Sequence, residues 1–331
     1  MIWLTWRQLR TQFLVAAIGL AVVAAYLIFL GVRIRHDYLA DVINCVPTDC
    51  GNTRRLFTDR YVVPVSLLGM LLLALPGLVG AFWGAPLVAR ELETGTDRLV
   101  WNQSVTRGRW LAVKLALGGA AAVAVTAALS LLLTWNASRY DQWTGNRFAA
   151  LSFGARNVVP LGYAAFAFVL GVLVGLLVRR TVPAMAITLG VFAVLQIAVP
   201  TMIRSHIMPP ITGTVRFSAD AMQHAQGFGI SPDRGASVRG YVMPGTWPMQ
   251  SLSRVYNADG TPYTAAQARQ CVAGDFDKDM DCMQRQDLHF SYRYQPGSRY
   301  WPFQWIELSA YLVLTLLLAG AALWRIRRRT G

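Results

Sequence analysis

Residues 158–203 read VVPLGYAAFAFVLGVLVGLLVRRTVPAMAITLGVFAVLQIAVPTMI, and this stretch decides the fold. It contains two uncharged apolar runs, 158–178 and 181–203, which are separated only by Arg179-Arg180. Each run is long enough to cross a hydrocarbon core of about 30 Å as an α-helix that rises about 1.5 Å per residue. The sequence therefore predicts two membrane-spanning helices joined by a tight basic turn.

The composition of the whole chain is that of a membrane protein. Of its 331 residues, 54% are hydrophobic and 15% are charged, whereas charged residues make up about 25% of an ordinary soluble domain. The soluble enzyme folds are thereby excluded. The net charge of +14 does not indicate nucleic-acid binding, because the arginines follow span flanks and loops instead of forming one stripe. The only two lysines, Lys114 and Lys278, fit no phosphate-binding loop, so we expect no cofactor on this chain itself.

Four further apolar runs predict the remaining spans. They cover residues 12–32, 62–88, 115–135 and 303–324. A total of six spans places both chain ends on one side of the membrane. Lys and Arg are denser in the chain ends, in 89–114 and in the Arg179-Arg180 turn than in the other loops. Because basic loops stay in the cytoplasm, we expect both termini to be cytoplasmic in a bacterial plasma membrane.

The residues ahead of the first span predict an interfacial helix. Four apolar side chains fall on one narrow stripe at helical spacing, namely Ile2, Trp6, Leu9 and Phe13. Such a helix would lie at the inner membrane surface and lead into the first span. An ordinary basic anchor with tryptophans at headgroup depth explains the pattern equally well, and both interpretations stay open.

The loop at 89–114, between the second and third spans, contains signals for helix ends. Gly95 interrupts the helix that descends from the second span. Thr96 can cap a new helix with Asp97 in its first turn, where the helix dipole favours an anion. Thr106 can cap the third span in the same way.

The new helix is predicted at about 97–103, across the inner face of the membrane. It presents Leu99 and Val100, followed by Trp101, to a partner. This shape suits docking into a groove of a soluble protein. The alternative is a solvated loop, which would not require three consecutive apolar residues.

Residues 204–302 form the longest polar stretch and predict a large external loop domain between the fifth and sixth spans. The chain is thus expected to comprise three parts, 1–203, 204–302 and 303–331. All four cysteines fall in external loops, where disulfides persist. Close spacing favours Cys45 with Cys50 and Cys271 with Cys282, although three connectivities are possible.

No motif predicts a catalytic, cofactor or metal site. Carboxylates alternate from Asp275 to Asp281 as in a calcium loop, but Met280 replaces the required glycine and Gln286 the bidentate glutamate. An acidic turn is the better interpretation, with calcium binding left open. The four histidines are scattered singly, so a zinc enzyme is poorly supported. Glu307 is the only charged residue within a predicted span, near its outer end, where it can reach the interface.

Polar residues within the spans are candidates for lining a substrate path. They are Tyr26, Ser66, Thr126, Thr188 and Gln196. Hydrogen bonds between helices are the usual explanation for such residues. Glycines in the second and fourth spans more often mark close helix packing than a substrate.

The segment from Phe82 to Leu115 resembles the loop between the second and third spans of ABC type 2 exporter permeases, especially actinobacterial ones. The similarity is carried by the core ARELETGT at 89–96, by SVTR at 104–107 and by Lys114. The opening MIWLTWRQLR at 1–10 is similar to theirs as well.

This resemblance implies a homodimer of permeases in membrane lipid, bound to two copies of a cytoplasmic ATP-binding cassette subunit that carries ATP and Mg. It also implies a re-entrant element between the fifth and sixth spans, where residues 204–302 are longer than usual for the family. The helix at 97–103 would be the coupling element, with the signature positions just before it. The residues expected to couple to the ATPase are Glu91, Glu93, Gly95, Thr96, Asp97, Arg98, Leu99 and Val100.

We therefore expect an all-α membrane protein with six transmembrane helices, an N-terminal interfacial helix, a cytoplasmic coupling helix and the external loop domain. The expected function is that of a non-catalytic permease. Spans without fixed charges favour a hydrophobic or amphipathic cargo, such as a drug, antibiotic, peptide or lipid. A membrane enzyme, or a sensor or scaffold that uses residues 204–302, is the alternative.

Overall fold

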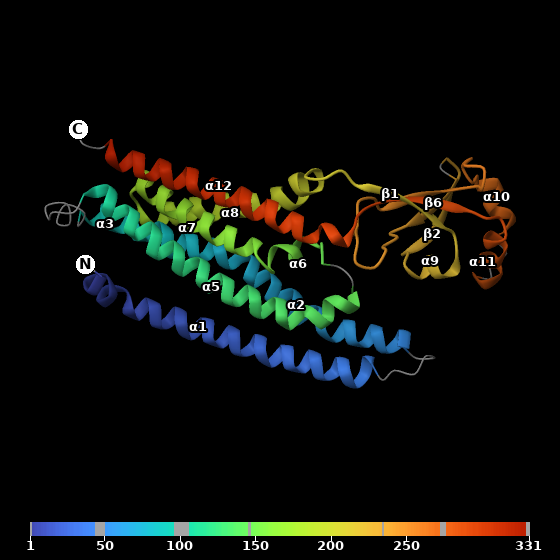
Figure 1. Ribbon diagram of the computed structural model, residues 1–331, viewed down its shortest axis with the longest axis horizontal. Coiled ribbons are helices and arrows are strands. Elements are labelled where there is room, and N and C mark those ends of the chain that lie inside the picture. Colours follow the sequence, from blue (N-terminus) through green and yellow to red (C-terminus); the bar gives the residue numbers. More distant parts are fainter. Residues whose placement is uncertain are drawn as a thin grey trace. The chain divides into compact units, whose positions relative to one another are not determined.

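The computed structural model describes residues 2–43, 50–95, 106–144, 147–233, 235–271 and 276–328. The chain divides into two compact units (Figure 1). The first unit comprises Met1–Thr144, Ala150–Val199 and Pro302–Gly331, and the second comprises Gly145–Ala149 and Pro200–Trp301.

The described part of the first unit consists of helices. In chain order they are α1 (Ile2–Asp37), the π-helical η1 (Tyr38–Val42), α2 (Cys50–Val79), the π-helical η2 (Gly80–Gly84), α3 (Ala85–Thr94), α5 (Arg107–Thr144), α6 (Ala150–Gly154), α7 (Val159–Val178), α8 (Thr181–Ala198) and most of α12 (Tyr300–Arg327). In Figure 1, α3, the beginning of α1 and the end of α12 lie at the same end of this bundle.

Six helical stretches of the described residues are long and apolar enough to cross a membrane. They are Ala17–Asp41, Arg55–Thr94, Arg107–Asp141, Val159–Val178, Thr181–His206 and Gly297–Arg327. These candidate spans follow the order of the predicted ones, and several continue beyond the apolar runs into polar flanks. The predicted interfacial helix and the first span form one uninterrupted helix, α1.

The second candidate span changes its hydrogen-bond register near its end. Pro86, in the first turn of α3, has no N–H to donate to the preceding turn. The π turn η2 lies directly before it, and the N–H of Ala85 donates to the carbonyl of Gly80. Such single π turns arise where the regular helical ladder is interrupted. The helix is therefore prolonged to Thr94 instead of ending at the proline.

Glycines bring η2 and α3 into backbone contact with α7. A Cβ atom on Gly171 would lie 2.1 Å from the carbonyl oxygen of Gly80, and one on Gly175 would lie 2.6 Å from that of Ala85. Conversely, a Cβ atom on Gly80 would lie 2.3 Å from the carbonyl oxygen of Ala167. These glycines thus serve close helix packing, the interpretation that the sequence favoured.

The second unit contains an antiparallel β-sheet. Its elements are η3 (Val199–Ile203), η4 (Arg204–His206), β1 (Ile211–Arg216), α9 (Ala219–Gln223), β2 (Gly227–Ser231), β3 (Gly235–Arg239), β4 (Trp247–Pro248), β5 (Leu252–Tyr256), α10 (Ala265–Gln270), α11 (Phe276–Gln284), β6 (His289–Gln295), η5 (Gly297–Arg299) and the start of α12. The strand order is β1-β6-β5-β3-β2, and β4 also pairs with β6.

The prediction of an all-α protein is therefore wrong for this unit. In β6, Phe290 and Tyr292 are buried whereas Arg293 is exposed, which is the period of two that a half-buried strand requires. Each strand has at most seven residues, so its alternation is a weak signal beside the long apolar runs. A disulfide joins Cys271 to Cys282, as predicted. The predicted bridge from Cys45 to Cys50 involves a residue outside the described ranges.

Candidate functional site

Two of the predicted signals around the loop between the second and third spans are confirmed. Gly95 ends α3 in a left-handed conformation with φ of 70°, which glycine adopts without strain. Thr106 caps α5, because its side-chain oxygen accepts from the N–H of Arg109 at 3.4 Å. Residues 96–105, including the predicted coupling residues from Thr96 to Val100 and the helix at 97–103, lie outside the described ranges.

Glu91 connects α3 to the beginning of α5. The Lys114 ammonium lies 2.6 Å from Oε1 of Glu91, and it also donates to the carbonyl of Leu87 at 3.1 Å. The same ammonium lies 4.3 Å from the ring centroid of Trp110. The lysine side chain is 14% exposed, so its charge is balanced by partners within the chain more than by solvent.

Glu93 connects α3 to the beginning of α8. Its Oε2 accepts from the backbone N–H of Thr181 at 2.9 Å and from the Thr181 hydroxyl at 2.7 Å. Arg180, the N-cap residue of α8, provides no side-chain cap. The carboxylate of Glu93 therefore takes over the role of the capping side chain, and its negative charge suits the positive end of the helix dipole.

The inner face of α3 is buried in an apolar cluster. Val88 packs there with Trp110 and Leu111 of α5, with Val172 of α7 and with Ile326 of α12. Helix α3 is thus held by packing as well as by its two glutamates. The residues that flank 96–105 are thus fixed to the helical bundle.

The polar residues predicted to line a path differ in their exposure. Tyr26 is 46% exposed, and Thr126 and Thr188 are buried. The Thr188 hydroxyl donates back to the carbonyl of Ala184, as an ordinary helical threonine does. Ser66 and Gln196 are half-buried on α2 and α8. A cavity of about 320 Å³ between α1, α2 and α5 is lined by apolar side chains and by none of these five residues.

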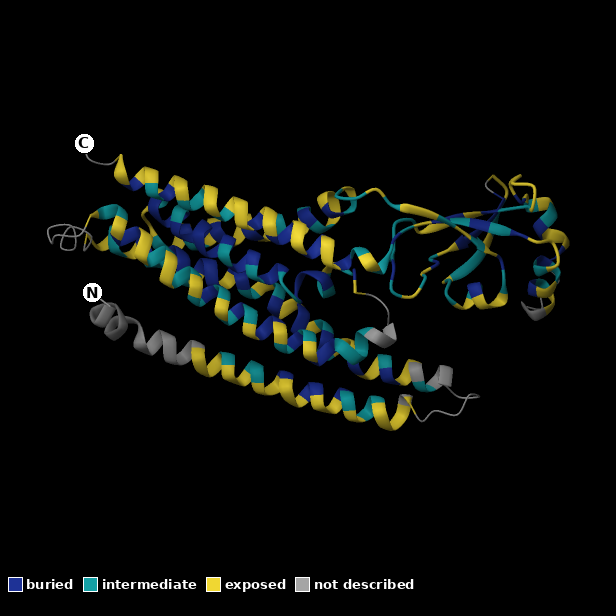
Figure 2. Cartoon of the chain, viewed as in Figure 1, coloured by how far each residue is buried: buried dark blue, intermediate teal, exposed yellow. Residues whose placement is uncertain are grey.

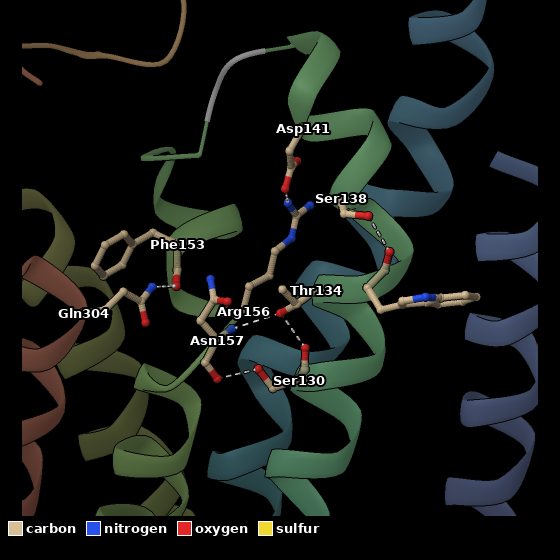
Figure 3. A network of polar contacts seen from close by, with 9 residues as sticks. Ser130, Thr134, Ser138, Asp141, Phe153, Arg156, Asn157 and Gln304 are labelled. Carbon is tan, nitrogen blue, oxygen red and sulfur yellow. Dashed lines mark hydrogen bonds and ion pairs between the residues drawn. The ribbon is translucent and has the colours of Figure 1, made fainter. Parts of the chain in front are cut away.

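A buried polar network at the other end of the bundle escaped the sequence analysis (Figure 3). Arg156 forms an ion pair with Asp141 of α5, although it lies in the connection between α6 and α7. Asn157 donates from its N–H to the Thr134 hydroxyl at 3.1 Å and accepts from the Ser130 hydroxyl at 2.9 Å. Loops normally run over the surface, and the sequence contains no signal that this connection is buried. Asn157 also has a positive φ angle, which a hydropathy profile cannot predict.

Two further residues of this region come from α12. Gln304 donates to the carbonyl of Phe153 and accepts from the N–H of Val159, each at 3.1 Å. Glu307 is 3% exposed and accepts from the hydroxyl of Tyr163. It is buried beside α7 and does not reach an interface, contrary to the expectation from sequence.

No group of three or more metal-binding side chains occurs among the residues that the structure describes. Lys278, Asp279 and Asp281 of the acidic run lie in the helix α11, not in a loop. Asp281 approaches Arg285 at 3.7 Å, one helical turn away. This is the geometry of a charged helix surface. The calcium-binding loop of an EF-hand has a different geometry.

Comparison with known proteins identifies the family. The model of the family described as ABC-2 membrane transporter related matches residues 17–204. No curated protein and no solved structure matches the chain. The matched part includes the second half of α1 and the helices from α2 to α8, and with them Glu91, Glu93, Lys114 and Thr181. Because the match covers more than half of the chain, this multi-pass membrane protein belongs to the ABC-2 membrane transporter related family of permeases.

Proposed function

We propose that the chain is the permease subunit of an ATP-driven exporter. The observation that carries this proposal is the family match over 17–204, since permeases of this family generally work with an ATP-binding cassette partner. The chain would supply the membrane path, and ATP hydrolysis with Mg would take place on the partner. Two permease copies would enclose the path between them.

The loop 96–105 is the proposed docking element for the ATPase. Its two ends are held by α3 and α5, which the Glu91–Lys114 ion pair joins. Leu99 and Val100 would be the apolar anchors in a groove of the ATPase, and Gly95 directs the chain into this loop by its left-handed turn. A rigid base suits such an element, because a force applied to the loop then moves the helices instead of deforming the loop.

The proposed cargo is hydrophobic or amphipathic and moves outward. The candidate spans are predominantly apolar, and the cavity between α1, α2 and α5 has an apolar lining. Such a path offers little compensation for the dehydration of a small ion. A drug, an antibiotic, a peptide or a lipid fits this environment better.

Coexpression with a candidate ATP-binding cassette subunit, such as one encoded near the permease gene, tests the function. We expect a stable complex that hydrolyses ATP when both proteins are present in lipid nanodiscs. Leu99→Asp should abolish copurification. Burying a neutral polar group without a partner costs roughly 2–7 kcal/mol, and burying an ionised carboxylate costs more. Leu252→Asp, at a 37% exposed position of β5 in the second unit, is the control for the same substitution outside the loop. Normal complex yield with Leu99→Asp would show that this loop does not dock.

Thiol labelling tests the proposed orientation in the plasma membrane. Single cysteines are placed at Ser104, expected in the cytoplasm, and at Ser251, an exposed residue of the second unit. An impermeant maleimide applied to intact cells should label position 251 and not position 104. The reverse pattern would invert the topology.

A further inference from the structure

We propose that Glu91 and Glu93 do not contact the ATPase but form an internal brace that makes α3, α5 and α8 move as one body. The brace consists of the Glu91–Lys114 and Glu93–Thr181 contacts. This inference rests on the proposed function, because it explains how movement of the loop 96–105 would reach the membrane-spanning helices.

The first argument is that one oxygen of each carboxylate is already bound within the chain. Glu91 is 33% exposed at its side chain and holds the Lys114 ammonium at 2.6 Å. Glu93 is more exposed, yet its Oε2 accepts two hydrogen bonds from Thr181. A residue that recognised the ATPase directly would have to give up these bonds or share them. The family resemblance suggested coupling at these positions, and the contacts identify the partners as helices of the same chain.

The second argument is the position of Lys114. It lies two turns into α5, and its ammonium is bound by the Glu91 carboxylate, by the Leu87 carbonyl and by the ring of Trp110. Three contacts in a poorly solvated site hold the cation in one place, which a single exposed ion pair would not do. The end of α3 and the start of α5 are therefore fixed to one another on either side of the loop.

The third argument concerns α8. Its N-cap residue is Arg180, whose extended backbone leads into the helix without a capping side chain. Glu93 of α3, which lies 88 positions before Thr181 in the chain, supplies the missing acceptor. A cap within the same segment would stabilise α8 locally. A cap from α3 also transmits any displacement of α3 to α8.

The fourth argument is that α3 cannot slide independently of α7. Gly175 of α7 allows the backbone of α3 to approach so closely that an added Cβ atom would lie 2.6 Å from the Ala85 carbonyl oxygen. Backbones packed this closely change between discrete arrangements and do not slide continuously past one another. The loop thus acts on α5, α7 and α8 together.

The test compares Glu91→Ala and Glu93→Ala with the wild type as complexes with the ATPase in lipid nanodiscs. A spin label at Val194 of α8, an exposed position, is present in both permease copies and reports the distance between the two α8 helices with and without ATP and vanadate. Copurification should stay at the wild-type level. The nucleotide-dependent shift in distance should be largely lost, because displacement of α3 would no longer be transmitted to α8.

Matched variants separate the brace from a general loss of stability. Glu93→Gln retains an oxygen acceptor for Thr181 and should keep most of the shift. Combining Glu91→Lys with Lys114→Glu restores opposite charges and should recover part of it. Asp59→Ala removes a carboxylate that is 68% exposed and paired with Arg55 at 3.8 Å, and it should leave the shift unchanged.

A cross-link gives an independent measurement. Cysteines at positions 93 and 181, joined by a short bifunctional thiol reagent, replace the hydrogen bonds by a covalent link. A preserved nucleotide response supports a brace that stays closed. Loss of the response in the cross-linked protein would mean that the contact must open, and that result overturns the proposal.

Other results would also overturn it. If both alanine variants lose copurification while the permease stays folded, the glutamates contact the ATPase after all. If both keep the full distance shift, the contacts carry no coupling. Failure of the wild type to bind the ATPase would instead refute the proposed function, so the two failures are distinguishable.

Discussion

The hydroxyl of Tyr163 on α7 donates a hydrogen bond to the carboxylate of Glu307 on α12, and both side chains are buried. Tyr163 also stacks edge to face with Tyr311, with ring centroids 4.7 Å apart. One turn earlier on α12, Gln304 accepts from the N–H of Val159 at the start of α7 and donates to the carbonyl of Phe153 in α6. Two helices that are far apart in sequence are therefore joined by polar groups in an apolar bundle.

Removing this hydrogen bond should destabilise the protein only moderately. Hydrogen bonds between membrane helices contribute about 0.6 kcal/mol on average and about 1.7 kcal/mol at most. Tyr163→Phe should fall in this range, and Gln304→Leu should cost more, because it removes two bonds to backbone groups. Denaturant unfolding in detergent micelles measures both. Thr315→Val removes a hydroxyl that donates only to the Tyr311 carbonyl of its own helix, and it should be nearly neutral. Equal effects of all three variants would contradict this ranking.

The backbone contact between α7 and η2 should not tolerate a methyl group. In Gly171→Ala the new Cβ atom would lie 2.1 Å from the carbonyl oxygen of Gly80, so one backbone must move. Overpacking typically costs about 1–3 kcal/mol, and we expect the upper end because no flexible side chain can yield. Gly190→Ala on α8 is the control, since nothing lies within 4 Å of its added Cβ atom. Thermal unfolding in detergent should separate the two variants by several degrees.

Glycine should be required at position 95 because of the left-handed backbone conformation, and not because space for a side chain is lacking. Nothing lies within 4 Å of a Cβ atom at this position, so any loss in Gly95→Ala arises from φ of 70°. We expect a cost of roughly 1–2 kcal/mol for a non-glycine residue there. Gly320→Ala within α12 meets equally open space and should stabilise by about 0.5–1 kcal/mol. We expect Gly95→Ala to lower the temperature of thermal unfolding and Gly320→Ala to raise it. Changes in the same direction would argue against a strained turn.

The disulfide between Cys271 and Cys282 should stabilise the second unit. It closes a loop with a sequence separation of 11, which corresponds to about 3 kcal/mol on the loop-entropy account. Replacing both cysteines by serine should make the unit more sensitive to limited proteolysis, because its core includes Cys271. Peptide mapping without reduction should recover the two cysteines in one cross-linked fragment. A bridge from either of them to Cys45 or Cys50 would refute the pairing.

The sequence alone determined the membrane class, the order of the candidate spans and the turn signals at Gly95 and Thr106. These features depend on local properties. An apolar run such as 158–178 needs no partner to prefer the bilayer, and a glycine or threonine at a helix end acts on the adjacent turn. The spacing of Cys271 and Cys282 is equally local, and that pairing was predictable.

Only the tertiary structure decided which groups meet across the chain. Glu93 lies 88 positions from Thr181, and Gln304 lies 145 positions from Val159, and no periodicity encodes such contacts. The sheet of the second unit depends in the same way on pairing between strands as distant as β1 and β6. Hydropathy records whether a residue prefers lipid or water. Which group binds a buried carboxylate depends instead on how the helices pack around it.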